Sequence, residues 1–503
     1  MTLERSPSSL LQAGVQAHKL GDLKSAEELY QKALSRYGNE ESYGDLKDAD
    51  VAELLHLLGA LKVQKLLGDD DDDDHVTPQS AVQGLDAAVQ LLRKSLLLLP
   101  SDAGNAARAR IVCSLGTALL HAPERKRLGD SGSGLGRSKG VHLEEAVEFL
   151  REACTLNGQR WAAWYNVARA LSLLLQEREE CKSSAGEVKA LEEEKLHALR
   201  KALSLKPRHS GCLYRLGMSL RERGDQDEAS KALEDFLSTA NDATSSGRRR
   251  IAGARHWLAV LRGETTATAP AEYVAGLFDG YAERFDEHLV QTLEYRTPQL
   301  LAEELSQVKT VIASELGDEE PMFQSCADLG CGTGLMGPYL RDLGVQHLEG
   351  VDLSSKMLQV AKDKLRGYDR LLCGDLVEVF PPGDGAARTT FDLVVAADVF
   401  VYLGDLSNVF RAAYDSMSGD GRAVLAFSTE APPRSGSANE HEGTLAEGSF
   451  KLAETGRYLH TASYVRQCAE ECGFKLWKRS NVVLRKNGGK PVYGHLHFLR
   501  KMC

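Results

Sequence analysis

The sequence predicts two structural classes in one chain, an all-α array in the N-terminal half and an α/β domain in the C-terminal half. The pattern between about Leu10 and Ala240 is helical, and it repeats. From Cys326 onward, short apolar runs alternate with helical segments, which is typical of a parallel sheet covered by helices. A chain of 503 residues is also too long for one hydrophobic core, so two or three domains are expected.

The composition is that of an ordinary globular protein. Apolar residues make up 43% of the chain and charged residues 26%. The formal net charge of −11 gives no global field that would attract nucleic acid or an acidic membrane. We therefore expect neither as a partner.

The cysteines and the apolar runs predict the compartment. The ten cysteines form no Cys-x-x-Cys pair, so we expect buried free thiols in a reducing compartment rather than zinc ligands or disulfides. Residues Met1–Arg5 contain no hydrophobic secretory core, and no apolar stretch is long enough to span a bilayer. These features predict a cytoplasmic protein without bound metal.

The helical half repeats small residues at fixed positions. Gly14 is followed by Ala26 and Gly217 by Ala229, an offset of twelve in both units (26 − 14 and 229 − 217). Small residues at these positions allow two antiparallel helices to approach closely. Three intermediate units keep both ends of the pattern with a longer turn, although the fourth has Lys195 at its central small position. The pattern resembles the tetratricopeptide repeat, a helix-turn-helix unit of about 34 residues.

This resemblance implies a stacked array with a concave surface for peptides or partner proteins. The alternative is that the array supports the second domain or forms a dimer. We expect a protein partner in the repeat groove. Two inserts are interpreted as loops: the acidic run Asp69–Asp74 as a solvated segment, and the glycine-rich run Gly132–Gly136 as a flexible one.

The junction between the halves is predicted from composition. Arg250–Leu258 is interpreted as a helix that closes the array, and Gly263–Pro270 as a linker. The expected domains are therefore residues 1–262 for the array, 263–270 for the linker and 271–503 for the α/β domain. Aromatic residues recur at helical spacing between Tyr273 and Asp286, which predicts an amphipathic helix.

Three glycines at alternate positions follow the first predicted strand. Gly330, Gly332 and Gly334 come directly after the apolar run that reaches Asp328. Glycine permits a sharp turn and lets a ligand approach the backbone. The free N–H groups of the following helix favour an anionic ligand group.

A second strand ends in an acidic residue at the offset that ribose binding requires. Asp352 lies 22 residues after Gly330 (352 − 330). The G-x-G-x-G spacing and the preceding Asp328 differ from the dinucleotide fingerprint. Here the sequence resembles a class I S-adenosylmethionine-dependent methyltransferase, rather than an NAD-binding domain or a turn without a ligand.

This resemblance implies a Rossmann-like domain of seven strands that binds S-adenosyl-L-methionine. It implies that Tyr281 contacts the cofactor carboxylate, Asp352 both ribose hydroxyls and Asp375 the adenine amino group. The segment from Tyr273 to Arg296 resembles the N-terminal helices of methyltransferases that are often fused to tetratricopeptide repeats. The expected cofactor-binding residues are Tyr281, Asp328, Gly330, Gly332, Gly334, Asp352, Met357, Asp375 and Leu376.

Further candidate residues follow the remaining strands, on the side where the methyl acceptor is expected to bind. Strands are expected at 370–373, 391–396, 422–427, 475–477 and 495–499. Asp398 and Tyr402 follow the central strand, where residues line the ligand crevice, although Asp398 is equally a candidate for a structural hydrogen bond. His460, in the turn Arg457–His460, is the nearby base that titrates near neutral pH, or else a structural residue before a helix.

Two functions follow from these observations. The first is methyl transfer from S-adenosylmethionine to a small molecule, or to a protein brought by the repeats. The second is an adaptor whose methyltransferase fold binds the cofactor without turnover. The intact glycines and the two acidic strand ends favour the enzyme.

Overall fold

The computed structural model describes most of the chain as two compact units, Met1–Ala240 and Asn241–Cys503. The acidic run Asp69–Asp74 and the glycine-rich run Gly132–Gly136 lie outside the described residues. The described residues are 6–37, 48–67, 79–121, 139–180, 183–282, 284–289, 293–316, 323–364, 366–379, 390–419, 421–431, 445–446 and 448–502.

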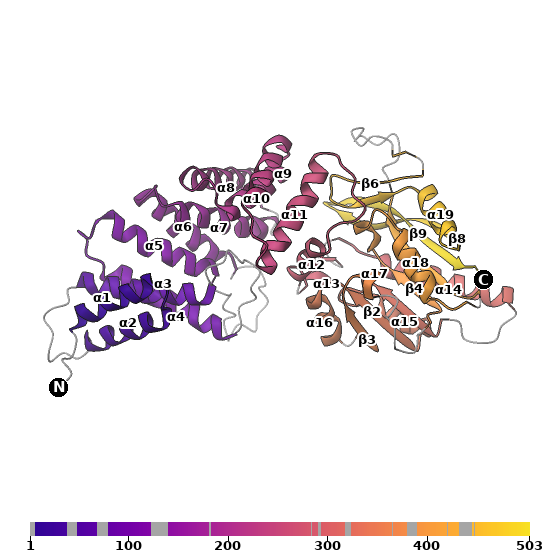
Figure 1. The fold of residues 1–503 in the computed structure, drawn as a ribbon, viewed down its shortest axis with the longest axis horizontal. Helices are drawn as coiled ribbons and strands as arrows, with labels where there is room; N and C mark the ends of the chain where they lie inside the picture. The colour runs from indigo at the N-terminus through magenta and orange to yellow at the C-terminus, as the bar shows by residue number, and fades with distance from the viewer. Residues whose placement is uncertain are drawn as a thin grey trace. The chain divides into compact units, whose positions relative to one another are not determined.

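The described residues of the N-terminal unit form five consecutive helix pairs, drawn from indigo to magenta in Figure 1. Each pair corresponds to one predicted repeat, so the all-α class is confirmed. The pairs are α1 (Pro7–Lys19) with α2 (Leu23–Tyr37), α3 (Asp48–Leu67) with α4 (Gln79–Leu98), α5 (Gly104–His121) with α6 (Lys139–Leu156), α7 (Trp161–Glu180) with α8 (Ala185–Leu205), and α9 (Ser210–Arg223) with α10 (Gln226–Thr239).

The repeat glycines explain why these helices pack so closely. A Cβ atom on Gly116 would lie 2.6 Å from Leu150 Cγ, and one on Gly217 would lie 2.7 Å from Leu233. Both leucines are fully buried. In the fourth unit the side chain of Lys195 is buried in place of a small residue, and its amine lies 3.8 Å from Glu222.

The C-terminal unit is built on a nine-stranded sheet, drawn from orange to yellow in Figure 1. The path is β3-β2-β1-β4-β5-β7-β6; the first five strands run parallel, and β9 lies antiparallel to both β5 and β8. This confirms the α/β class. The strands are β1 (Ser325–Leu329), β2 (His347–Asp352), β3 (Arg370–Cys373), β4 (Leu393–Ala396), β5 (Val424–Glu430), β6 (Phe450–Leu452), β7 (Tyr458–His460), β8 (Phe474–Asn487) and β9 (Lys490–Lys501).

Two of these strands are additional to the seven that were predicted. β6 and β7 form an antiparallel hairpin at the edge of the sheet, where the sequence predicts a turn around His460. β8 and β9 are also far longer than predicted, and they meet at Gly488 and Gly489, which both have positive φ. Because many residues of β8 remain partly exposed, its apolar signal is weak.

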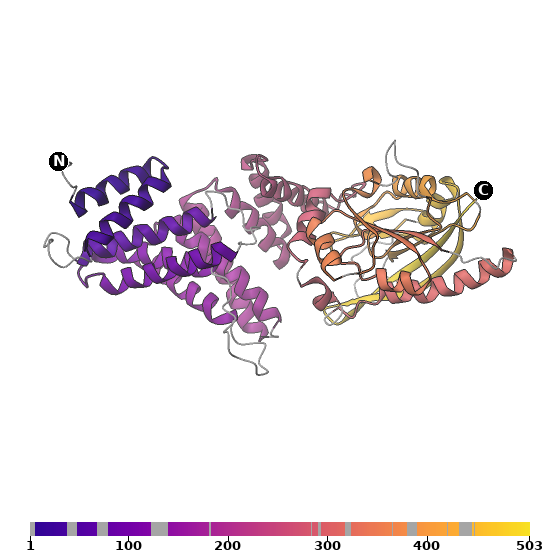
Figure 2. The same cartoon turned by 90° about the horizontal axis from the view of Figure 1, so that it is seen from below.

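Helices cover both faces of the sheet (Figure 2). On one face α14 (Thr297–Leu316) and α15 (Gly337–Asp342) pack through Leu305 and Leu340 against the strands. On the other, α18 (Ser407–Ser416) and α19 (Ala462–Glu471) contribute Phe410 and Val465 to a second core. The carboxyl ends of β1, β2 and β4 therefore emerge between two packed layers.

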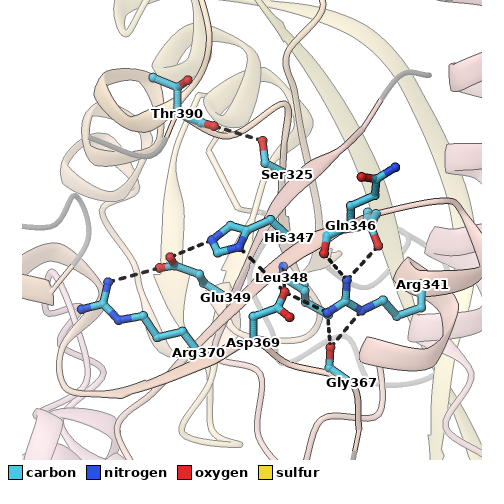
Figure 3. A network of polar contacts seen from close by, with 11 residues as sticks. Ser325, Arg341, Gln346, His347, Leu348, Glu349, Gly367, Asp369, Arg370 and Thr390 are labelled. Carbon is cyan, nitrogen blue, oxygen red and sulfur yellow. Dashed lines mark hydrogen bonds and ion pairs between the residues drawn. The ribbon is translucent and has the colours of Figure 1, made fainter. Parts of the chain in front are cut away.

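A polar network holds the edge of the sheet near β2 and β3 (Figure 3). Arg341, at the end of α15, donates to the backbone carbonyls of Val345 and Gln346 at 2.9 and 2.6 Å and to Asp369 at 2.8 Å. Asp369 in turn accepts the Leu348 N–H at 2.7 Å. The network fixes the loop that leads from α15 into β2.

The division between the units differs from the predicted boundary at residue 262. Helix α11 (Ser245–Leu261), expected to close the array, belongs to the C-terminal unit. His256 Nε2 lies 2.9 Å from the Gly456 carbonyl, and Trp257 covers Gly456 so closely that a Cβ there would lie 2.6 Å from the indole. These contacts pack α11 on the C-terminal unit.

The segment 263–270, predicted as a linker, is bound along the C-terminal unit. Ala267 O accepts N–H groups from Gly404 and Asp405 at 2.9 and 2.8 Å, and the Ala269 N–H donates to Tyr402 O at 2.9 Å. Thr266 Oγ1 lies 2.5 Å from the Tyr458 hydroxyl. These contacts make the segment an edge element of the unit rather than a free connection.

The close approach of α5 and α6 predicts a stability change. Alanine at an unobstructed helical glycine stabilises by about 0.5–1 kcal/mol, but a forced overlap in a packed core costs about 1–3 kcal/mol. Gly116→Ala should therefore lower the free energy of unfolding measured in urea. Gly186→Ala in α8 is the control, because its Cβ would meet nothing within 4 Å. A Gly116→Ala protein as stable as this control would contradict the packing described.

Candidate functional site

The three glycines after β1 have different surroundings. Gly330, Gly332 and Gly334 all have positive φ, at 64°, 55° and 81°. A Cβ on Gly330 would lie 2.5 Å from Val399, and one on Gly334 would lie 2.8 Å from Arg366. At Gly332 the nearest atom would be 3.9 Å away, on Phe285. The backbone is thus packed on both sides of Gly332 and open at it, as the close approach of a ligand requires.

Asp352, at the end of β2, is held by two backbone donors. The Gly332 N–H donates to Oδ2 and the Ser354 N–H to Oδ1, both at 2.8 Å. Burial raises the pKa of Asp352, and these two N–H groups oppose the shift. A carboxylate can accept more than one hydrogen bond on each oxygen, so Asp352 retains capacity for two hydroxyl donors. The spacing between Gly330 and Asp352 alone predicts that this carboxylate binds ribose hydroxyls.

Asp328 lies deeper, beneath the glycine turn. Its side chain is fully buried and accepts the Tyr368 hydroxyl at 2.5 Å. Burial raises the pKa of Asp328 to about 7. Asp328 therefore supports the turn from below, in contact with Tyr368.

Two further carboxylates anchor the segment that follows α12 (Ala271–Asp279). Asp279 accepts Ser354 Oγ at 2.6 Å and Arg249 at 2.9 Å. Asp286, within α13 (Phe285–Glu287), accepts the Thr333 hydroxyl and also binds Lys364 and Arg366, each at 2.7 Å. Sequence reasoning missed both anchors.

These anchors hold aromatic rings beside the glycine turn. Phe285 is the nearest neighbour of the open position at Gly332. Its ring contacts Phe278 at a centroid distance of 6.0 Å, and Phe278 contacts Tyr402 at 5.6 Å. The rings form an apolar wall that extends from the glycine turn toward the end of β4.

The other predicted cofactor residues lie around the same strand ends. The Tyr281 hydroxyl hydrogen-bonds His288 Nδ1. Met357 is buried in the first turn of α16 (Ser355–Asp363). Asp375 caps α17 (Leu376–Val379) by accepting the Val377 N–H at 2.9 Å, and Leu376, as the first residue of that helix, has no intrahelical acceptor for its N–H.

A second polar centre follows β4. Asp398 has φ 56°, which is unusual for a residue with a side chain. Its N–H donates to Ser428 Oγ at 2.8 Å, and that hydroxyl donates back to Asp398 Oδ1 at 2.7 Å. Thr297 Oγ1 lies 3.4 Å from Oδ2. Burial raises the pKa of Asp398.

Arg485 connects Asp398 to Glu430 at the end of β5, and Arg457 is a second partner of Glu430. Arg485 donates to Asp398 at 3.3 Å and also to Glu430. Arg457 donates to Glu430 at 3.0 Å, and its guanidinium lies 6.0 Å from the centre of the Tyr402 ring. Burial raises the pKa of Glu430 to about 7. We refer to Asp398, Glu430, Arg457 and Arg485 as the β4–β5 charge cluster.

His460 has the surroundings of a structural residue. Its side chain is fully buried in β7, and Nε2 lies 3.1 Å from the Gly404 carbonyl, which requires an N–H on that nitrogen. Nδ1 is buried without a partner among the described residues. Burial lowers the pKa of His460 to about 4. The geometry favours a structural role for His460 over a role as a base.

The described part of the chain contains neither a metal-binding cluster nor a membrane-spanning helix. No group of three His, Cys, Asp or Glu side chains there is arranged to hold a metal ion. None of the described helices is both long and apolar enough to cross a membrane.

A segment in each half of the chain matches a known protein family. Residues 327–425 match a family described as a methyltransferase domain, and residues 212–240 match the tetratricopeptide repeat. A malonyl-[acyl-carrier protein] O-methyltransferase of Bacillus anthracis is 30% identical over 104 residues, 20% of this chain and 36% of that protein. Phosphoethanolamine N-methyltransferase 1 of Zea mays is 24% identical over 155 residues, 30% of this chain and 28% of that protein. The chain thus spans about a third of the length of these curated relatives.

Solved structures are similar to part of this chain. An S-adenosylmethionine-dependent methyltransferase of Mesorhizobium loti is 18% identical, with 38% of this chain and 96% of that chain covered and a TM-score of 0.28.

The buried Asp328 predicts a pH dependence of stability. Its carboxyl has a pKa of about 7 in the folded chain and about 4 when unfolded, so its stabilising contribution is full below pH 4 and is lost as the pH rises toward 7. Asp328→Asn keeps an acceptor for Tyr368 and cannot ionise. In urea unfolding of residues 241–503, the free energy of unfolding of Asp328→Asn relative to the wild type should rise with pH. The rise should be up to about 1.4 kcal/mol per pH unit in this range.

Asp363→Asn, at an exposed position of α16, is the matched control and should show no such trend. A difference between Asp328→Asn and wild type that is constant from pH 5 to pH 8 would contradict the assignment.

Proposed function

We propose that this chain, in which a class I methyltransferase domain is joined to tetratricopeptide repeats, transfers a methyl group from S-adenosyl-L-methionine to a small-molecule or protein acceptor. The observation that carries the proposal is the pairing of an open glycine, Gly332, with the backbone-held carboxylate of Asp352. The proposal includes a cytosolic location, which follows from interpreting the cysteines as thiols in a reducing compartment.

The donor set fits the cofactor. Asp352 would accept the two ribose hydroxyls, and Gly332 leaves room for the ligand against the backbone. Asp375 and the Leu376 N–H would bind the adenine edge beside buried Met357. Gly330, Gly334 and Asp328 would act through the shape of the turn. For Tyr281 to bind the cofactor carboxylate, its hydroxyl would have to leave His288.

When bound, S-adenosylmethionine supplies a methyl group already activated by its sulfonium. The chain then has to orient an acceptor and exclude water. The rings of Phe278, Phe285 and Tyr402 would exclude water. Asp398 and Tyr402 are assigned to the acceptor side; burial raises the pKa of the Tyr402 hydroxyl, which keeps it a hydrogen-bond donor. We assign His460 to holding the Gly404 loop rather than to proton transfer.

The acceptor atom is left open by the relatives. Their names include an O-methyltransferase and an N-methyltransferase, so they favour neither oxygen nor nitrogen. The repeats are proposed to bind a protein, either the acceptor itself or a partner. A tethered second site raises the local concentration of a protein acceptor, but a small metabolite is too small to contact both sites.

Isotope-labelled methyl transfer tests the activity. The full chain, S-adenosylmethionine labelled in the methyl group and a fractionated cell extract should yield a labelled product, which mass spectrometry then identifies. Tight binding of S-adenosylhomocysteine without transfer into any fraction would favour the adaptor over the enzyme.

Cofactor affinity should separate two neighbouring glycines. Gly332→Ala places a methyl group in open space, so S-adenosylhomocysteine affinity measured by calorimetry should fall at least tenfold while most of the fold's stability is retained. Gly330→Ala collides with Val399 and should mainly lower the melting temperature. Asp352→Ala removes a charged acceptor, worth about 1.5–3 kcal/mol, and should also lose at least tenfold in affinity. Unchanged affinity in Gly332→Ala and Asp352→Ala would remove both residues from the site.

A truncation tests the role of the repeats. The shortened protein should begin at Asn241, because α11 and residues 263–270 belong to the C-terminal unit. With a protein acceptor delivered by the repeats, kcat/KM should fall while S-adenosylhomocysteine affinity is unchanged. Equal kcat/KM in both proteins would leave the array a scaffolding role and favour a small acceptor.

A further inference from the structure

The β4–β5 charge cluster has one accessible member. The side chains of Arg485 and Glu430 are each 7% exposed and that of Asp398 is 14% exposed, whereas the Arg457 side chain is 32% exposed. The other three side chains are therefore enclosed by protein, and that of Arg457 is the most exposed of the four.

The buried charges do not depend on Arg457 alone. Arg485 binds both Asp398 and Glu430, so each carboxylate keeps a cationic partner if Arg457 engages another anion. Arg457 has five N–H donors. Its described contacts are with one oxygen of Glu430 and with the Tyr402 hydroxyl. The guanidinium thus has N–H donors beyond these contacts for a further acceptor group.

A continuous set of contacts joins this arginine to the glycine turn. On one side Arg457 lies against Tyr402, which contacts Phe278 and then Phe285 beside Gly332. On the other side, Asp398 is followed by Val399, which packs on Gly330. The partly exposed Arg457 side chain therefore lies on the acceptor side of the proposed cofactor site, next to aromatic rings.

We propose that Arg457 binds a carboxylate of the methyl acceptor and so selects acceptors that carry this group. The inference rests on the proposed methyltransferase function and names the substrate class of its site. A planar guanidinium matches a carboxylate in shape and charge. The aromatic rings nearby limit water, which strengthens the pairing. An ammonium acceptor would instead meet the accessible positive charge and be repelled.

A matched pair of small probes tests recognition without knowledge of the natural acceptor. Benzoate and benzamide have the same ring and differ in charge. In titrations of the full chain saturated with S-adenosylhomocysteine, followed by ligand-observed NMR, benzoate should bind and benzamide should bind at least tenfold more weakly. Benzoate affinity should fall at least tenfold in Arg457→Met, and Arg457→Lys should restore part of it.

Arg370→Met is the control variant. Arg370 is also an arginine paired with a buried glutamate, Glu349 at 3.8 Å, but it lies in the network of Figure 3. This variant should bind benzoate like the wild type. S-adenosylhomocysteine affinity should be unchanged in all three variants, which shows that they are folded and that the cofactor site is intact. If the wild type itself does not bind S-adenosylhomocysteine, the proposed methyltransferase function is contradicted instead.

Methyl transfer supplies the second measurement. An extract fraction that accepts label is treated with carbodiimide and ammonia, which converts carboxylates into amides. Label transfer by the wild type should then be lost, and Arg457→Met should raise KM for the untreated fraction at least tenfold with a smaller change in kcat. Benzoate binding unaffected by Arg457→Met, or transfer unaffected by amidation, would overturn the inference and leave the methyltransferase proposal standing.

Discussion

The arrangement of the C-terminal unit depends on one carboxylate held between two backbone N–H groups. Asp352 fixes the glycine turn through Gly332 and the start of α16 through Ser354. The Ser354 side chain then binds Asp279, which also holds Arg249 of α11. One residue at the end of β2 therefore connects the sheet, the turn and helices α11 and α12. Since a carboxylate that accepts backbone N–H groups is fixed in direction, its remaining acceptor sites are preorganised for a ligand.

The two polar centres of this unit are separated by a layer of side chains. The glycine turn and Asp352 present an anionic group and an open backbone, whereas the β4–β5 charge cluster pairs two carboxylates with two guanidinium groups. Buried charges are stable only when paired, which explains why Arg485 contacts both acids. Arg457 shares Glu430 with this second arginine, so the buried acids keep a cationic partner if Arg457 binds a ligand. Under the proposed function, this division would allow cofactor binding and acceptor recognition to be altered independently.

The sequence predicts the parts of the structure that have a local signal. The glycine and alanine spacing identifies the repeats because each glycine meets a large side chain of its partner helix, as Gly116 meets Leu150. The turn is predicted because its backbone geometry demands glycine, and Asp352 is predicted from its spacing to Gly330. Asp279 and Asp286 could not be predicted, because an acidic residue near a helix end looks the same whether it faces water or Ser354 and Arg366. The assignment of α11 to the C-terminal unit rests on Trp257 and Gly456, about 200 residues apart, which no local pattern can reveal.

A crystal structure of the full chain with S-adenosylhomocysteine would show directly whether Asp352 binds the ribose. Both ribose hydroxyls should lie within hydrogen-bond distance of Asp352, with the ligand packed against the backbone at Gly332. The Gly332 and Ser354 N–H groups should still hold the carboxylate. A ligand bound elsewhere, or one whose ribose has no contact with Asp352, would contradict the proposed cofactor site.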